Sequence, residues 1–233
     1  MVIMKHIIKP LILGLSLFVW ASGNVYAAES EELDAGSSDN TAAVVDQSRA
    51  LSVAEKAQSQ FYRGMTSYLE GDYESAARSF HQAAGQGHAN AQFTLGVMYY
   101  QGDGVDQDYK EAIKWYRLAA DQGLAPAQFN VGMMYYLGDG VVQDYQEAAR
   151  WYAMVAEQGL AQAQFNLGMM YNLGQGVSQD LVHAYMWADL AAANDHPKAT
   201  ELRNTVAQAL APPDIAKAQQ LAKECQERSY KGC

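Results

Sequence analysis

The chain has 233 residues, 26 of them acidic and 16 basic, which gives a formal net charge of −10. This acidity makes nucleic acid and anionic membrane surfaces unfavourable partners, and it favours basic or apolar ones. Only two cysteines are present, Cys225 and Cys233, and both lie in the last nine residues.

The first 27 residues have the pattern of a secretory signal peptide. Lys5 and Lys9 precede a largely apolar run at 11–20, and Val-Tyr-Ala at 25–27 fits a cleavage site between small residues. An uncleaved anchor is the alternative, but the apolar run is shorter than the ~20 residues that cross a bilayer. Cleavage would remove two lysines and leave 14 basic and 26 acidic residues, a charge of −12. We therefore expect a periplasmic or secreted protein with no integral membrane segment in the mature chain.

The segment after the expected cleavage site is strongly acidic. Residues 28–50 contain six acidic residues against a single basic one, Arg49, which predicts a disordered linker. Ser52-Val53-Ala54-Glu55 has the form of a capping box, so the first helix is expected to begin there and to run toward Leu69.

Three copies of a 36-residue pattern follow. Each copy has Ala-Gln, Leu-Gly or Val-Gly, Met-Tyr, Gly-x-Gly-Val, Asp, Ala and Trp at matching positions, between 91 and 115, 127 and 151, and 163 and 187. Self-similarity at this period is typical of helical solenoids, which usually bind proteins rather than catalyse reactions.

The small and aromatic positions of the pattern have a packing explanation. A glycine inside the first helix of each copy predicts close contact with the second helix, at Gly96, Gly132 and Gly168. Tryptophans recurring at helical spacing are predicted to fill the space between repeats, at Trp115, Trp151 and Trp187. An aromatic ligand box is the alternative interpretation of these tryptophans.

The Gly-x-Gly-Val segments, which begin at 102, 138 and 174, predict turns with two residues free to adopt positive φ. Asp108 and Asp144 are then expected as N-caps, with a glutamate three residues later, whereas the third copy has His183 at that position. A phosphate-binding loop is the alternative, but the spacing G-x-G-x-x-G and a P-loop lysine are missing.

The pattern resembles the Sel1-like repeat family, a relative of the tetratricopeptide repeat with a longer internal turn. The resemblance implies an all-α fold, a right-handed superhelical solenoid of antiparallel helix hairpins. The segment before the copies resembles a plain tetratricopeptide unit, since Gly64 and Ala76 are 12 positions apart where Gly96 and Ala112 are 16 apart. The expected organisation is a tetratricopeptide-like hairpin at 51–87, repeats at 88–124, 125–160 and 161–197, and C-terminal capping helices and a tail at 198–233. The last helix is expected to start at Pro212-Pro213-Asp214.

The resemblance also implies that the first helix of each hairpin lines a concave face. This face would be an aromatic and methionine-rich trough that suits an apolar peptide or an amphipathic helix. The expected partner-binding residues are Phe61, Met65, Tyr68, Phe93, Val97, Tyr100, Phe129, Met133, Tyr136, Phe165, Met169 and Asn172. The alternative is that the phenylalanines pack against the preceding repeat and only the tyrosines and polar groups are exposed.

Cys225 and Cys233 are expected to form a disulfide if the chain is exported, and two free thiols or an intermolecular bridge are the alternatives. The histidines form no metal-ligand spacing, so we expect no metal and no cofactor. Because an intermolecular disulfide is one of the alternatives, the cysteines do not determine the oligomeric state.

We therefore expect an exported protein-interaction adaptor or scaffold that is not an enzyme. A structural, self-assembling envelope component is the alternative. A hydrolase or β-lactam-binding protein is disfavoured, although such binding has been proposed for cysteine-rich Sel1-like proteins, because these repeats contain no cysteine and the chain has no Ser-x-x-Lys pattern.

Overall fold

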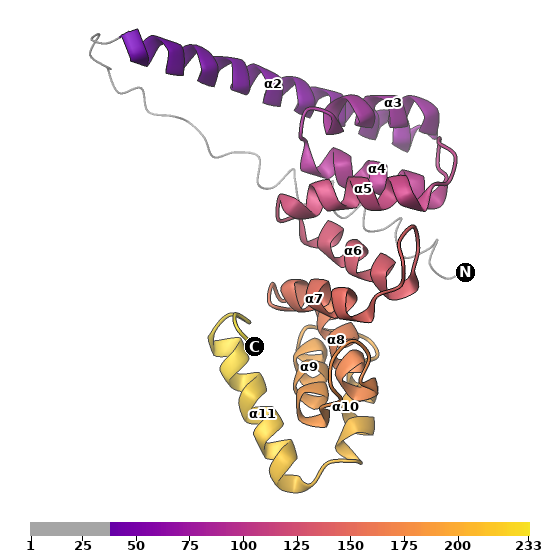
Figure 1. Cartoon of the computed structure of the whole chain (residues 1–233), viewed down its shortest axis with the longest axis vertical. Coiled ribbons are helices and arrows are strands. Elements are labelled where there is room, and N and C mark those ends of the chain that lie inside the picture. The colour runs from indigo at the N-terminus through magenta and orange to yellow at the C-terminus, as the bar shows by residue number, and fades with distance from the viewer. Residues whose placement is uncertain (1–37) are drawn as a thin grey trace. The chain divides into compact units, whose positions relative to one another are not determined.

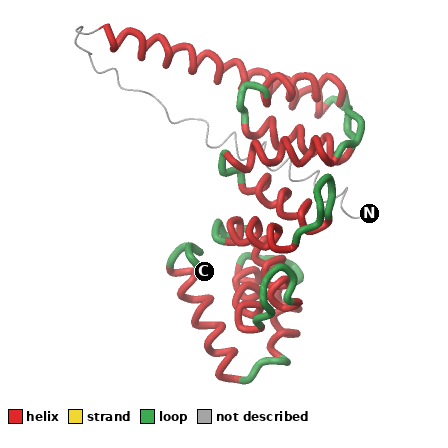
Figure 2. The backbone as a smooth tube through the Cα atoms, in the orientation of Figure 1, coloured by secondary structure: helices red, strands yellow, loops and turns green. Residues whose placement is uncertain are grey.

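The computed structural model describes residues 38–233, with side chains at 49 and from 51 onward. Within that range it is all-helical, with ten helices and no strand (Figures 1 and 2). The helices are α2 (Ser38–Leu69), α3 (Tyr73–Ala84), α4 (Ala89–Gln101), α5 (Tyr109–Asp121), α6 (Ala125–Leu137), α7 (Tyr145–Ala156), α8 (Ala161–Leu173), α9 (Leu181–Ala193), α10 (Ala199–Ala207) and α11 (Pro212–Glu227).

The described part of the chain divides into two compact units, with the boundary between His88 and Ala89. In the first unit, α2 packs against α3 as a hairpin. The two helices are in close contact at Gly64, since a Cβ at this position would lie 2.7 Å from the ring of Phe80, which is fully buried. Asp72 caps α3, and its carboxylate accepts a hydrogen bond from the backbone N–H of Ser75 at 3.0 Å.

The N-terminal part of α2 differs from the expected start of the first helix. The helix begins at Ser38, so Ser52 lies inside it and does not open it, and the prediction of a helix start there is wrong. Residues 38–50 of the predicted disordered linker are therefore helical. The rest of that linker, 28–37, and the predicted signal peptide lie outside the described residues.

In the second unit, α4 to α9 form three consecutive hairpins, α4 with α5, α6 with α7, and α8 with α9 (Figure 1). The predicted close contacts at the helical glycines are confirmed. A Cβ at Gly96 would lie 2.6 Å from the ring of Tyr116, and one at Gly132 would lie 3.1 Å from Tyr152 and from the Cβ of Trp151. Trp187 is buried, and Trp115 and Trp151 are half-buried.

The turns within the hairpins form as the glycine pattern predicts. The first and third residues of the second turn, Gly138 and Gly140, have φ values of +80° and +71°. The predicted N-caps are confirmed: Asp108 and Asp144 each accept hydrogen bonds from two backbone N–H groups of the following helix. In the third copy Asp180 caps α9 in the same way and also pairs with His183, with 2.7 Å between Oδ2 and Nδ1.

The C-terminal helices pack against the third repeat. Both α10 and α11 contact α9, and α11 begins at Pro212 as predicted. Cys225 and Cys233 form a disulfide in the structure, and Cys225 is fully buried. The loop between them turns the tail back, so that Tyr230 lies beside Gly159 and donates a hydrogen bond to Asn194 Oδ1 at 3.2 Å.

Candidate functional site

The first helices of the three repeats, α4, α6 and α8, contain no aspartate, glutamate, lysine, arginine or histidine. Their surface therefore consists of aliphatic, aromatic, amide and hydroxyl groups. Ionisable charges of the repeats lie on the turns and on the second helices instead. A partner that lies along the first helices would meet an uncharged surface.

Some of the residues predicted to bind a partner are buried instead of exposed. Phe61, Met65, Phe93 and Val97 have relative exposures of 8%, 9%, 3% and 1%, so they cannot offer their side chains to a partner, contrary to the expectation. Phe93 packs against Tyr116 of its own repeat, with ring centroids 5.8 Å apart, and not against the preceding repeat as the alternative had it. The other eight predicted residues are half-buried: Tyr68, Tyr100, Phe129, Met133, Tyr136, Phe165, Met169 and Asn172.

A phenylalanine recurs at the same position of each first helix, at Phe93, Phe129 and Phe165, and its aromatic neighbour differs between the repeats. Phe129 packs against Tyr152 of the second helix of its own repeat, with ring centroids 5.4 Å apart. The third repeat has Ala188 at the position that corresponds to Tyr152. Phe165 stacks on His196 instead, with centroids 4.2 Å apart and an interplanar angle of 18°. Phe61 stacks on His88 in the same way although it also contacts Phe80, so the stack follows from the histidine after the second helix.

Tyr100 and Tyr136, which were expected to be free for a partner, connect neighbouring repeats. The Tyr100 hydroxyl donates to Asp139 Oδ2 at 2.9 Å, and that of Tyr136 donates to Gln175 Oε1 at 3.1 Å. Burial, and then the hydrogen bond to Asp139, raises the pKa of Tyr100 well above its ordinary value. Both phenols therefore help to hold the next turn in place.

A pocket of about 220 Å³ lies between the second and third repeats, lined mainly by α8 with one residue each from α6 and α7. It is lined by Tyr136, Tyr152, Phe165, Asn166, Met169 and Met170. The structure thus brings together three of the predicted partner-binding residues, Tyr136, Phe165 and Met169. The lining of the pocket does not include the predicted residues of the first hairpin or of the first repeat.

Three lining residues were not predicted, Tyr152, Asn166 and Met170. Met170 belongs to the repeat pattern and is buried, with 1% of its surface exposed, and Tyr152 is buried as well, so neither offers its side chain to a partner. Asn166 Oδ1 accepts a hydrogen bond from Gln162 Nε2 at 3.3 Å. Burial raises the pKa of Tyr152, and the neighbouring Asn166 side chain opposes this shift. The signal for Asn166 was present in the sequence, because Asn130 lies 36 residues earlier in the second repeat.

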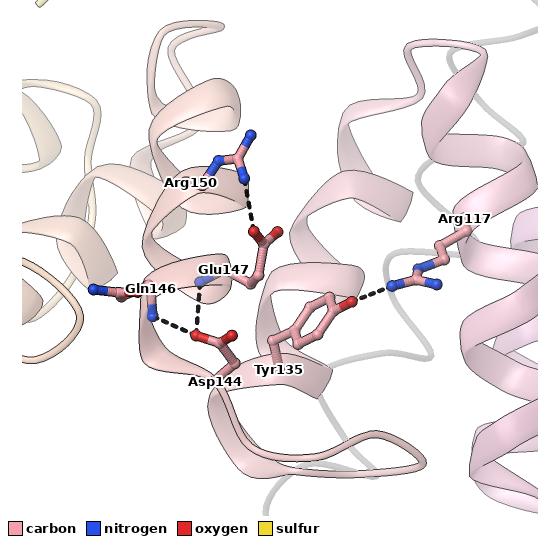
Figure 3. Close-up of polar contacts among 6 residues, drawn as sticks. All are labelled: Arg117, Tyr135, Asp144, Gln146, Glu147 and Arg150. Carbon is pink, nitrogen blue, oxygen red and sulfur yellow. Dashed lines mark hydrogen bonds and ion pairs between the residues drawn. The ribbon is translucent and has the colours of Figure 1, made fainter.

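The second helices carry the polar contacts of another surface (Figure 3). Asp144 receives the backbone N–H groups of Gln146 and Glu147, and Glu147 pairs with Arg150 at 2.7 Å. The Glu147 carboxylate therefore forms an ion pair with Arg150, and the Glu111 carboxylate forms the corresponding ion pair with Lys114.

One contact in Figure 3 joins two repeats. Arg117 donates a hydrogen bond to the hydroxyl of Tyr135, and its guanidinium carbon lies 5.5 Å from the centre of that ring. This arginine therefore ties α5 to the first helix of the next repeat.

Among the described residues, no group of three or more histidine, cysteine, aspartate or glutamate side chains is placed to hold a metal ion. No helix in the same part of the chain is long and apolar enough to span a membrane.

The family model of the Sel1 repeat matches three segments, residues 89–124, 125–160 and 161–196. These segments coincide with the three hairpins α4–α5, α6–α7 and α8–α9. No match was found among curated proteins.

Two solved structures are similar to this chain. One is a Sel1 repeat protein from Oxalobacter formigenes, with 31% identity and a TM-score of 0.59 over 70% of this chain and 68% of that one. The other is c5321, a protective antigen of uropathogenic Escherichia coli with an SLR fold, with 29% identity and a TM-score of 0.52 over 75% of this chain. This chain spans only 47% of the length of c5321. The repeat matches and the relative from Oxalobacter together show that the chain belongs to the Sel1 repeat family.

Proposed function

We propose that this protein is an exported scaffold that binds a segment of a partner protein along the first helices of its Sel1 repeats. Sel1 repeat proteins are generally protein-interaction scaffolds and typically non-catalytic. The observation that carries the proposal is the pocket on α6 and α8, where Tyr136, Phe165 and Met169 meet. Its lining is mainly apolar and aromatic, as in the central pockets of protein interfaces.

Export is the second part of the proposal. It is supported by the signal-peptide pattern of residues 1–27 and by the proximity of Cys225 and Cys233, since disulfides persist in oxidising compartments. The intact mass of protein recovered from the envelope or the medium tests it. We expect a chain that begins at Ala28 and is two hydrogens lighter than the fully reduced form. A full-length, reduced chain recovered from the cytoplasm would contradict export.

Affinity capture with a matched pair of variants tests the binding face. Met169→Gln replaces a pocket methionine by a polar residue of similar size that suits a helix. Met154→Gln makes the same change on the second helix α7, where the side chain is 47% exposed and does not line the pocket. We expect partners captured by the unmodified protein to be retained by Met154→Gln and lost by Met169→Gln.

The tyrosines are less suitable for this experiment, because removing Tyr100 or Tyr136 also removes a hydrogen bond between repeats. Far-ultraviolet circular dichroism and thermal melting check that both methionine variants fold. Equal capture by the two variants contradicts the proposed face. Loss of capture by Met154→Gln alone would move the binding site to the second helices.

A further inference from the structure

We infer that the pocket on α6 and α8 receives one large apolar side chain of a partner protein, and that lysine or arginine residues flank that side chain in the partner. This inference rests on the proposed function and specifies the chemistry of its partner. The size of the pocket, its lining and the charge of the surrounding repeats support it.

The size of the pocket favours an amino-acid side chain. At about 220 Å³, it is smaller than the ~300–1,000 Å³ typical of small-molecule and cofactor sites. It has room for the end of a leucine, methionine or phenylalanine. An interface of this kind gains most of its affinity from a few side chains that are fully desolvated in such pockets.

The lining offers both apolar contact and hydrogen bonds. The half-buried Phe165 and Met169 provide an apolar surface, and methionine adapts to side chains of different shape. Asn166 adds an amide at the same place, whose Oδ1 accepts a hydrogen bond from Gln162 Nε2 at 3.3 Å and keeps a further lone pair. Such an amide can pair with the backbone of a bound segment, whose polar groups lose water as they approach the surface.

The two repeats that line the pocket carry mostly negative charge, although Asp189, one of their acids, pairs with Arg203 of α10. The second and third repeats, residues 125–196, contain seven acidic residues and one basic residue, Arg150, which gives a net charge of −6. Arg150 pairs with Glu147. The first helices carry no charge, so the acids lie outside them, among others Asp139 after α6 and Glu157 before α8.

This distribution matches a partner with an apolar centre and basic ends. An apolar residue would be placed on the uncharged surface of α6 and α8, and flanking lysines or arginines would reach the acidic turns. Complementary charge increases the association rate and selects against acidic segments, which would be repelled. Each contact between exposed charges adds little to affinity, so the apolar residue is expected to dominate.

A peptide selection tests the inference directly. A phage-displayed library of random 12-residue peptides is selected on the chain from Ala28 to Cys233 with its disulfide formed. Enriched peptides are synthesised and titrated against the unmodified protein, Met169→Gln and the Met154→Gln control. We expect a consensus of leucine, methionine or phenylalanine next to lysine or arginine. Affinity should fall at least tenfold in Met169→Gln and stay unchanged in Met154→Gln.

The outcomes separate this inference from the proposed function. Enriched peptides that lack basic residues but depend on Met169 overturn the charge requirement and leave the proposed face standing. Peptides that bind Met169→Gln equally well overturn the pocket. No enrichment above an empty support also overturns it, whereas capture of a folded partner that depends on Met169 would still support the scaffold.

Two further measurements complete the test. For the selected peptides we expect the Kd to rise at least threefold between 50 and 500 mM NaCl, because salt screens exposed charges. An affinity independent of salt contradicts the role of flanking basic residues. Sedimentation velocity of the free protein reveals whether a second copy occupies the pocket. A dimer that Met169→Gln dissociates would overturn the inference in favour of self-association.

Discussion

The two ends of the helix hairpins hold neighbouring Sel1 repeats together by different physical means. At the end where the first helix turns into the second, glycine lets backbones touch. A Cβ at Gly140 would lie 2.4 Å from the carbonyl oxygen of Tyr109, and one at Gly176 would lie 2.1 Å from that of Tyr145. Each turn therefore lies directly on the backbone of the preceding repeat, and we call this the glycine end.

At the opposite end, buried amides connect the repeats, and we call this the amide end. Gln158 Nε2 donates to Gln128 Oε1 at 2.7 Å, and Gln128 Nε2 donates to the carbonyl of Ala120 at 3.1 Å. In the third repeat Asn194 takes the place of the donor and bonds Gln164 at 2.9 Å. Gln164 in turn donates to the carbonyl of Ala156, and its side chain is fully buried.

The two ends should therefore respond differently to mutation. The glycine end depends on the lack of a side chain at Gly140 and Gly176. A methyl group there would collide with the backbone of the preceding repeat, which can shift only together with its helix. The amide end depends on complete pairing, since its groups have left water and each must find a partner. A steric change should disrupt the first end and a loss of hydrogen-bonding groups the second.

The largest effect is expected for Gly176→Ala. The new Cβ would collide with the backbone of Tyr145, and alanine would also be strained at φ +70°. We expect a loss of about 2–4 kcal/mol in the free energy of unfolding, measured by urea denaturation. Gly123→Ala is the control, because its φ is +84° and a Cβ there has no atom within 4 Å. Equal losses in the two variants would show that the conformational strain alone matters.

The disulfide should stabilise the amide end of the third repeat by a smaller amount. It closes the loop that carries Tyr230, whose hydroxyl bonds Asn194 and so continues the chain of hydrogen bonds to Gln164. Loop entropy gives at most about 2–3 kcal/mol for so short a loop. We expect a reducing agent to lower the melting temperature of the unmodified protein. The Cys233→Ser variant should melt at that lower temperature with or without the reducing agent, and an unchanged melting temperature on reduction would contradict this role.

The turns of the glycine end could be predicted from the sequence. Gly138 and Gly140 recur at fixed positions in each copy, and only a turn with positive φ or a close backbone approach gives glycine such a role. The same reasoning located Gly132 against the second helix. These causes act within one turn or one hairpin, so a single sequence reveals them, whereas the contact of Gly140 with the backbone of Tyr109 in the preceding repeat was not predicted.

The amide end and the full pocket could not be predicted in the same way. Gln128 and Gln158 are 30 residues apart, and no local sequence pattern indicates that these two side chains form a hydrogen bond. Phe93 and Phe165 occupy the same position in the repeat, yet one is buried and the other half-buried. Burial depends on neighbours beyond the repeat, which the repeat pattern does not contain. For the same reason Ser52, a good capping residue, lies within a longer helix.

Gln164→Leu tests the amide end at one position. Leucine fills a similar volume but leaves the carbonyl of Ala156 and the amide of Asn194 without this partner, which should cost about 1–3 kcal/mol in the free energy of unfolding. Gln146→Leu is the control, because this side chain is exposed on α7. We expect urea denaturation to show a loss for the first variant and a change within about 0.5 kcal/mol for the second. Comparable values for both would mean that the amide chain contributes nothing to stability.

The smallest expected effect concerns His196, which follows α9 near the amide end. Burial, and then the charge of Lys198, lowers the pKa of this histidine below 6.5. The unfolded chain therefore binds more protons than the folded one between these two pKa values, and the free energy of unfolding should fall as the pH drops through about 6.5. Leu124 and Leu160 occupy the same position in the first two repeats, so His196→Leu is a conservative way to remove this titration.

We expect the melting temperature of the unmodified protein to decrease more between pH 7.5 and 5.5 than that of His196→Leu. Some dependence should remain in the variant, because burial also lowers the pKa of His88 in the first unit. The same pH dependence in both proteins would show that the stack of His196 on Phe165 tolerates the charged ring. In that case the third repeat holds its end through Gln164 and Asn194, and the histidine keeps its stack on Phe165 and its hydrogen bond with Gln162 in both protonation states.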